Sequence, residues 1–265
     1  MAYFAVTFTF SWAIQVPLAL AAQGLLATSL PLGLHYVASF GPLVAAVVVT
    51  LVTRGWSGCR ELAARAVRWR APAGYYGFAV AAPLVVFGAF VLGGWLVSGD
   101  RPDLGALGEV DYLGSLGLLP ALGLWMATFG LGEEVGWRGF ALPRLQAGHS
   151  ALGASLVLGL FWAAWHLPAI FYRDTYRELG WMVVPVLLSV ATVGPVVYTW
   201  LFNSTHGSLL LVILFHGLFD FFSVWPTKGP VGPGFVMTVL LVFWAVRVYK
   251  VYGPATLSTE EKVTV

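Results

Sequence analysis

Long apolar stretches follow one another along almost the whole chain, and polar residues gather in the short segments between them. A helix needs about 20 mostly apolar residues to cross the hydrocarbon core of a membrane. On this criterion the pattern predicts about eight membrane-spanning helices. The expected spans are Tyr3–Ala22, Tyr36–Thr53, Tyr75–Val97, Leu113–Phe140, Ser150–Tyr172, Trp181–Phe202, Gly207–Val224 and Val231–Tyr249. We therefore expect an all-α integral membrane protein built as a helical bundle.

Composition supports this fold class and excludes others. Charged residues make up 10% of the 265 residues, whereas about a quarter of a soluble domain is charged. The net charge of +2 does not indicate a nucleic-acid partner. Because Cys59 is the single cysteine, neither an intramolecular disulfide nor a cluster of thiolate metal ligands can form. The partner expected from composition is membrane lipid.

The first apolar stretch resembles a signal peptide but lacks a basic start and is too long, so we interpret it as a retained span. No shift in composition marks a second domain. We expect one polytopic membrane domain over residues 1–252 and a mobile cytoplasmic tail over residues 253–265.

Charges in the connecting segments predict the orientation. The connection after the second span is rich in arginine, whereas the next connection is acidic; only Lys and Arg count in the positive-inside rule. The basic residues are Arg54, Arg60, Arg65, Arg68 and Arg70, and the acidic ones are Asp100, Asp103, Glu109 and Asp111. The basic connection is therefore expected in the cytoplasm. Alternation then predicts a multi-pass plasma-membrane protein with both termini cytoplasmic.

Several ionisable residues interrupt the apolar spans. They are Glu133, Glu134, Arg138, His166, His216 and Asp220. An ionised group in mid-membrane costs at least about 2.5–3.5 kcal/mol, so such groups persist when they pair and face a cavity. A single buried histidine or Glu–Arg pair is more often structural. Three spans that each bring such groups instead predict one functional site in a polar cavity.

Spacing predicts how these residues pair and how deep they lie. Glu134 and Arg138 are four residues apart and share a helical face, as do His216 and Asp220. The fourth and fifth spans bring their residues together only if they continue to about Phe140 and Tyr172, which places the polar groups about 10 Å inside the helix ends. We expect the cavity to open toward the cytoplasm. The remaining histidines, near span ends or in loops, are expected to be solvated or interfacial: His35, His149 and His206.

Three motifs resemble a known family. The first is Glu133-Glu134-x-x-x-Arg138, which continues as Gly-Phe-Ala-Leu-Pro-Arg-Leu; the second is Trp162 four residues before His166; the third is His216 four residues before Asp220. In this order they resemble the CAAX protease and bacteriocin-processing (CPBP, or Abi) family of intramembrane proteases, which includes Rce1-like prenyl-protein endopeptidases. That family usually has Phe at the Trp162 position, and its prenyl-protein endopeptidases have Asn at the Asp220 position.

The resemblance implies an eight-helix, glutamate-dependent endopeptidase that cleaves near the end of a membrane-associated, possibly prenylated, peptide. The expected substrate partner is therefore a peptide or a lipidated protein. Peptide hydrolysis needs an activated water and a donor for the oxyanion. Glu133 suits the role of the base that activates the water, and His166 can make a second contact to that water. His216, held by Asp220, suits the role of the oxyanion donor. Trp162, Glu134 and Arg138 are then supporting residues. No cofactor is expected; the alternative is a divalent metal such as zinc held by Glu133, His166 and His216.

Two other functions remain open at the level of sequence. A protein of the same fold can bind or shield a peptide without cleaving it, as a self-immunity or scaffold protein. The same ionisable residues can also form a proton relay in a small transporter. The sequence shows no pair of corresponding broken helices that would indicate inverted repeats, which disfavours the transporter.

Overall fold

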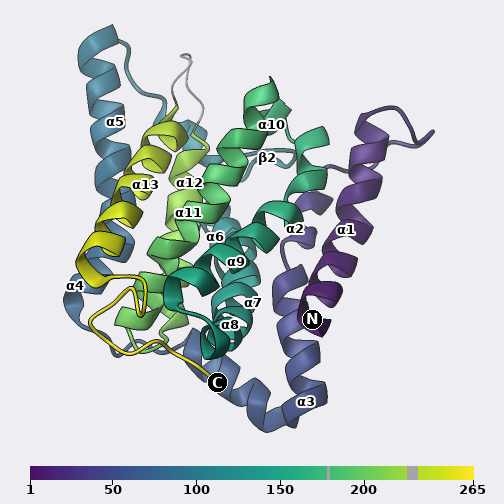
Figure 1. The fold of residues 1–265 in the computed structure, drawn as a ribbon. Coiled ribbons are helices and arrows are strands. Elements are labelled where there is room, and N and C mark those ends of the chain that lie inside the picture. The colour runs from purple at the N-terminus through teal and green to yellow at the C-terminus, as the bar shows by residue number, and fades with distance from the viewer. Residues whose placement is uncertain (178–179, 226–231) are drawn as a thin grey trace.

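The computed structural model describes residues 1–177, 180–225 and 232–265, and it is almost entirely helical (Figure 1). The helices are α1 (Ala2–Ala22), α2 (Leu34–Ala38), α3 (Gly41–Ala66), α4 (Ala73–Tyr76), α5 (Ala82–Ser98), α6 (Leu118–Trp125), α7 (Glu134–Gly136), α8 (Leu142–Gly148), α9 (Ala151–Trp165), α10 (Asp174–Arg177), α11 (Val183–Ser204), α12 (Leu209–Ser223) and α13 (Pro233–Tyr252). Two strands of two residues each, β1 (Glu109–Val110) and β2 (Gly114–Ser115), pair in antiparallel register. The all-α membrane fold expected from the sequence is confirmed.

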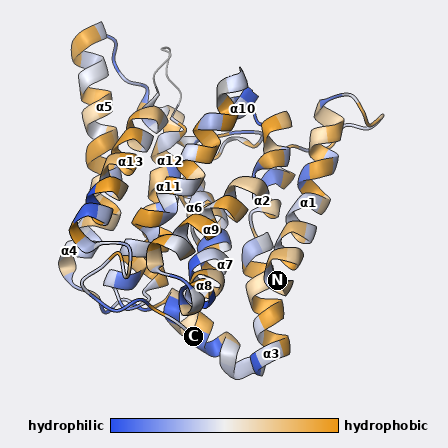
Figure 2. Ribbon diagram, in the orientation of Figure 1, coloured by the Kyte–Doolittle hydropathy of each residue, from blue (hydrophilic) through white to orange (hydrophobic). Residues whose placement is uncertain are grey.

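Six helical stretches are long and apolar enough to cross a membrane among the residues described. They are Ala2–Ala22, Leu34–Ala66, Ala73–Ser98, Ala151–Phe171, Val183–Ser204 and Pro233–Tyr252. The predicted count of eight is not reproduced, because α12 has 15 residues and the fourth expected span is broken into short pieces. Apolar residues line α1, α5 and α13 on the outside of the bundle (Figure 2). This multi-pass protein therefore presents apolar helices to lipid.

Wider π-helical turns interrupt the fourth expected span. They cover Met126–Glu133 and Trp137–Ala141, on either side of the short helix α7. The span nevertheless stays helical through Gly148, beyond the Phe140 that convergence requires. π-helical turns are rare and frequently occur at functional sites. Here they set the direction in which Glu133 and Glu134 leave the backbone.

Two glycines let this interrupted span approach its neighbours. A Cβ on Gly136 would lie 2.4 Å from backbone atoms of Pro42 in α3. A Cβ on Gly130 would lie 2.9 Å from the carbonyl oxygen of Ile213 in α12. Only glycine allows backbones to come this close. The span that carries both glutamates is therefore held between α3 and α12.

The fifth expected span stops being α-helical at His166. α9 ends at Trp165, and a tighter 3-10 turn covers Leu167–Phe171. Pro168 accounts for the change, because proline disrupts α-helical hydrogen bonding and restricts the residue before it. His166 therefore sits where the helix ends, with its side chain directed by the turn.

The segment after Tyr252, expected above as a mobile tail, lies in the structure as an ordered strap. The backbone amides of Ala151 and Leu152 donate to carbonyls of Ala255 and Pro254 at 2.9 and 3.0 Å. Leu257 is fully buried in the core. These contacts tie the strap to the start of α9 and supply the physical reason for its order.

Candidate functional site

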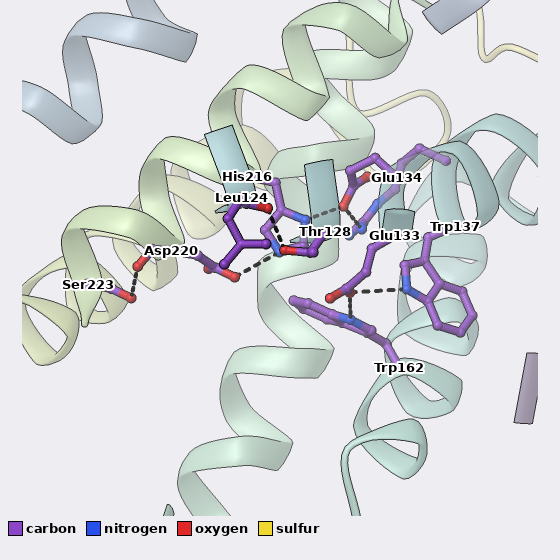
Figure 3. A network of polar contacts seen from close by, with 10 residues as sticks. Leu124, Thr128, Glu133, Glu134, Trp137, Trp162, His216, Asp220 and Ser223 are labelled. Carbon is purple, nitrogen blue, oxygen red and sulfur yellow. Dashed lines mark hydrogen bonds and ion pairs between the residues drawn. The ribbon is translucent and has the colours of Figure 1, made fainter. Parts of the chain in front are cut away.

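Glu133 lies at the end of a π-helical turn and is almost completely buried, with 2% of its surface exposed. Its Oε2 accepts hydrogen bonds from two indoles, at 2.8 Å from Trp162 and 3.3 Å from Trp137 (Figure 3). Trp137 was not singled out from the sequence, although it follows Glu133 by four residues. The two indole N–H groups fix the carboxylate and stabilise its charge.

Glu134 is the common acceptor for two buried donors. Its Oε1 lies 2.6 Å from Nη1 of Arg138 and 2.7 Å from Nδ1 of His216 (Figure 3). The pairing with Arg138 was expected from the spacing, but the contact with His216, which joins α7 to α12, was not. Glu134, Arg138 and His216 are each at most 1% exposed. The three side chains therefore form one buried, charge-paired unit.

His216 lies between two carboxylates. Its Nδ1 faces Glu134, and its Nε2 lies 3.3 Å from Oδ2 of Asp220, as the four-residue spacing predicted. Opposite charges on both sides favour the protonated ring, which can donate from both nitrogens. This arrangement makes Nε2 a directed hydrogen-bond donor at the edge of the cluster.

His166 is oriented by Trp162. Its Nδ1 lies 2.7 Å from the Trp162 carbonyl oxygen, which can only accept, so Nδ1 carries the proton. In the neutral ring, Nε2 is then the free acceptor. Because the indole of Trp162 also donates to Glu133, one residue fixes both the carboxylate and the imidazole.

Aromatic rings enclose the cluster. The guanidinium of Arg138 lies 4.2 Å from the ring centre of Tyr198 and 5.5 Å from that of Trp162. The ring of Tyr198 also packs edge-on against His216, with centroids 5.2 Å apart. Sequence reasoning missed Tyr198, because no spacing rule connects α11 to the motifs. These contacts shield the buried charges from lipid and water.

The site opens at one end of the bundle. Asp220 is 29% exposed at its side chain and His166 is half-buried, in contrast to the four buried residues beneath them. The indole of Trp225, just after α12, donates to the Asp103 carbonyl at 3.1 Å, so this end adjoins the acidic connection. Figure 1 shows α10 and β2 at this end, opposite α8 and the C-terminus. The predicted opening of the site toward the cytoplasm and the predicted cytoplasmic location of the basic connection therefore cannot both be correct.

The cavity beside the cluster is apolar rather than polar. It encloses about 230 Å³ between α5, α11, α12 and α13. Phe215, which immediately precedes His216 on α12, and Phe219, three residues after His216, line this cavity. The ionisable groups instead pack directly against one another.

The candidate metal ligands already have partners within the protein. Within the described residues, no group of three or more His, Cys, Asp or Glu side chains converges closely enough to hold one. Both ring nitrogens of His216 already face carboxylates, and Glu133 accepts from two indoles. A metal ion bound by the alternative ligand set Glu133, His166 and His216 would have to replace these contacts.

Among the other histidines, the expectation holds for two. His149 and His206 are exposed. His35 is instead 3% exposed, and its Nδ1 lies 2.7 Å from the hydroxyl of Tyr172. The expectation was wrong there because α2 buries one face, which carries His35, Tyr36 and Ala38, while Leu34 and Val37 on the same helix stay exposed.

Comparison with known proteins identifies the segment that holds this cluster. Residues 114–222 match the family model for type II CAAX prenyl endopeptidases, Rce1-like. A protein of Methanococcus maripaludis described as CAAX prenyl protease 2 is 33% identical over 130 residues. That alignment covers 45% of this chain and 46% of the relative, so the match spans about half of each protein. All six ionisable residues and both Trp162 and Trp137 fall inside the family match, so the segment that holds the cluster is similar to the Rce1-like family.

Proposed function

We propose that this protein is a glutamate-dependent intramembrane endopeptidase that hydrolyses a peptide bond near the C-terminus of a membrane-associated, prenylated substrate. The observation that carries the proposal is the double role of Trp162. Its indole holds the Glu133 carboxylate, and its carbonyl sets the tautomer of His166. A base and an imidazole acceptor fixed by one residue are arranged to hold a water between them. The family match of the surrounding segment supports the substrate class.

The reaction follows from these positions. Glu133 accepts a proton from the water, which His166 Nε2 orients, and the water oxygen attacks the peptide carbonyl carbon. The carbonyl oxygen becomes an oxyanion, and the Nε2–H of His216 stabilises it by donating to it in place of Asp220. Glu134 fixes His216 from the other side of the ring, and Asp220 supports its charge. When the C–N bond breaks, protonated Glu133 returns the proton to the leaving amine.

His166→Ala tests the proposed water contact. Purified protein in lipid vesicles is given a prenylated peptide with a C-terminal C-a-a-X sequence, and the released fragment is quantified by mass spectrometry. Loss of one proton-transfer or water-positioning group lowers kcat by about 100-fold or more. His149→Ala, which changes an exposed histidine, is the matched control and should leave the rate unchanged. Equal rates for wild type and His166→Ala would refute the assigned role.

Metal removal should leave cleavage unchanged, because the candidate ligands are already committed to partners within the protein. The measurement compares cleavage rates after incubation with 1,10-phenanthroline and with its non-chelating 1,7 isomer. A loss of activity with the chelator alone, restored by added zinc, would show that the site rearranges around a metal.

A further inference from the structure

Arg173 is a buried cation at the open end of the site. It follows the 3-10 turn after His166 and is 8% exposed. Its Nη2 lies 3.3 Å from Oδ2 of Asp111, whose side chain is 45% exposed. Within the described residues, its Nε is buried with no hydrogen-bond partner. An arginine presents five donors in a fixed fork, so this residue keeps unused capacity for an anion.

Hydrogen bonds on both sides of Arg173 hold its backbone in place. The Tyr172 hydroxyl contacts His35 at 2.7 Å. The Tyr112 hydroxyl donates to the Tyr172 carbonyl and accepts from the Asp174 amide, both at 3.3 Å. Tyr112 itself adopts a φ of 69°, a conformation that non-glycine residues rarely adopt unless surrounding contacts enforce it. The guanidinium is therefore mounted on a fixed segment rather than on a mobile loop.

The same segment runs directly from the site. The Ala169 amide donates to the His166 carbonyl, and the Arg173 amide donates to the Ala169 carbonyl, both at 2.9 Å. A 3-10 turn rises about 2.0 Å per residue, so the five residues of the turn, Leu167–Phe171, span about 10 Å, and Tyr172 separates the turn from Arg173. The guanidinium of Arg173 lies 5.7 Å from the ring centre of Tyr176 in α10.

We propose that Arg173 binds the free C-terminal carboxylate of the substrate. This inference rests on the proposed endopeptidase function. In a C-a-a-X sequence three residues follow the modified cysteine. Extended peptide covers about 3.3 Å per residue, so a bond cut beside that cysteine lies about 10 Å from the terminal carboxylate. The 3-10 turn, which covers five of the six residues between His166 and Arg173, has a comparable length. Arg173 offers charge-assisted hydrogen bonds to the carboxylate.

The test compares two prenylated peptides of identical sequence, one with a free C-terminal carboxylate and one with a C-terminal amide. Wild-type protein in lipid vesicles should cleave the acid with a kcat/KM about 10-fold to 100-fold higher, mainly through KM. Arg173→Gln should abolish this preference, so that the ratio of kcat/KM for the acid to kcat/KM for the amide falls to about one. Arg173→Lys keeps the charge without the fork and should retain part of the preference.

Asp111→Asn is the matched control, because it removes the ion pair but keeps Arg173. The preference for the acid should persist in this variant. The inference is overturned if Arg173→Gln and Asp111→Asn reduce the cleavage rate of both peptides equally, because that result indicates a structural role for the ion pair. It is also overturned if wild-type protein cleaves acid and amide equally well, in which case the proposed endopeptidase function still stands. Failure of wild-type protein to cleave either peptide overturns both.

Discussion

Glu133→Gln is expected to reduce peptide cleavage by about 10²–10⁴-fold, the range that a positioned general base contributes. The amide oxygen of glutamine can still accept from the indoles of Trp162 and Trp137, so the local packing is preserved. What glutamine cannot do is take a proton from water. The measurement is single-turnover cleavage of a prenylated peptide in vesicles, which separates the chemical step from substrate binding.

The matched control for this variant is Glu109→Gln, which removes an exposed carboxylate on β1. It should cleave at the wild-type rate. Substrate binding should also survive in Glu133→Gln, because the altered atom acts on water. If Glu133→Gln cleaves as fast as the control, Glu133 is not the base and the buried cluster is structural.

Glu134→Met is expected to destabilise the protein by about 3–5 kcal/mol, the usual cost of breaking a buried ion pair on one side. Glu134 Oε1 accepts from both Arg138 and His216, so the substitution leaves two buried donors without their acceptor. The double variant Glu134→Met with Arg138→Met should recover much of the loss, because it removes the stranded cation as well. Equilibrium unfolding in detergent micelles measures the free energy of unfolding for all three proteins.

The exposed pair Arg54–Glu61 supplies the control for that experiment. Its side chains are 43% and 55% exposed, and pairs of this kind contribute at most about 1 kcal/mol. Glu61→Met should therefore change the free energy of unfolding far less than Glu134→Met. Equal losses for the two variants, or a double variant no more stable than the single one, would contradict a coupled buried unit.

The residues of the cluster were predictable because charge inside an apolar span is costly and therefore conspicuous. Spacing along one helix also predicted two contacts correctly, Glu134 with Arg138 and His216 with Asp220. Both join residues four positions apart within one helical segment, which is a local property, although Arg138 lies in a π-helical turn. The all-α membrane fold followed from apolar run lengths in the same way.

Contacts between helices could not be predicted from spacing. The Glu134–His216 bond and the packing of Tyr198 on Arg138 join distant parts of the chain, and no local periodicity encodes them. The π-helical turns that aim Glu133 also leave no distinct apolar pattern. His35 was misjudged for a related reason, since its burial comes from a tertiary partner, Tyr172.

The order of the final segment shows the same limit. Residues 253–265 contain no long apolar run, so the sequence favoured a mobile tail. Their order depends on side-chain amides elsewhere: Asn203 donates to the Thr256 carbonyl at 2.9 Å, and Gln146 donates to the Val263 carbonyl at 2.8 Å. Those two amides also bond to each other, which places a buried polar anchor beneath the strap.

The central claim is that Glu133 activates water for peptide hydrolysis, and cleavage in ¹⁸O-labelled water tests it most directly. Wild-type protein in lipid vesicles, incubated with a prenylated C-a-a-X peptide, should place one ¹⁸O atom in the new carboxylate of the prenylated fragment. Glu133→Gln should yield almost no labelled fragment under the same conditions. Absence of product with wild-type protein, or equal labelling by wild type and Glu133→Gln, would contradict the account and favour a peptide-binding protein of the same fold or a different base.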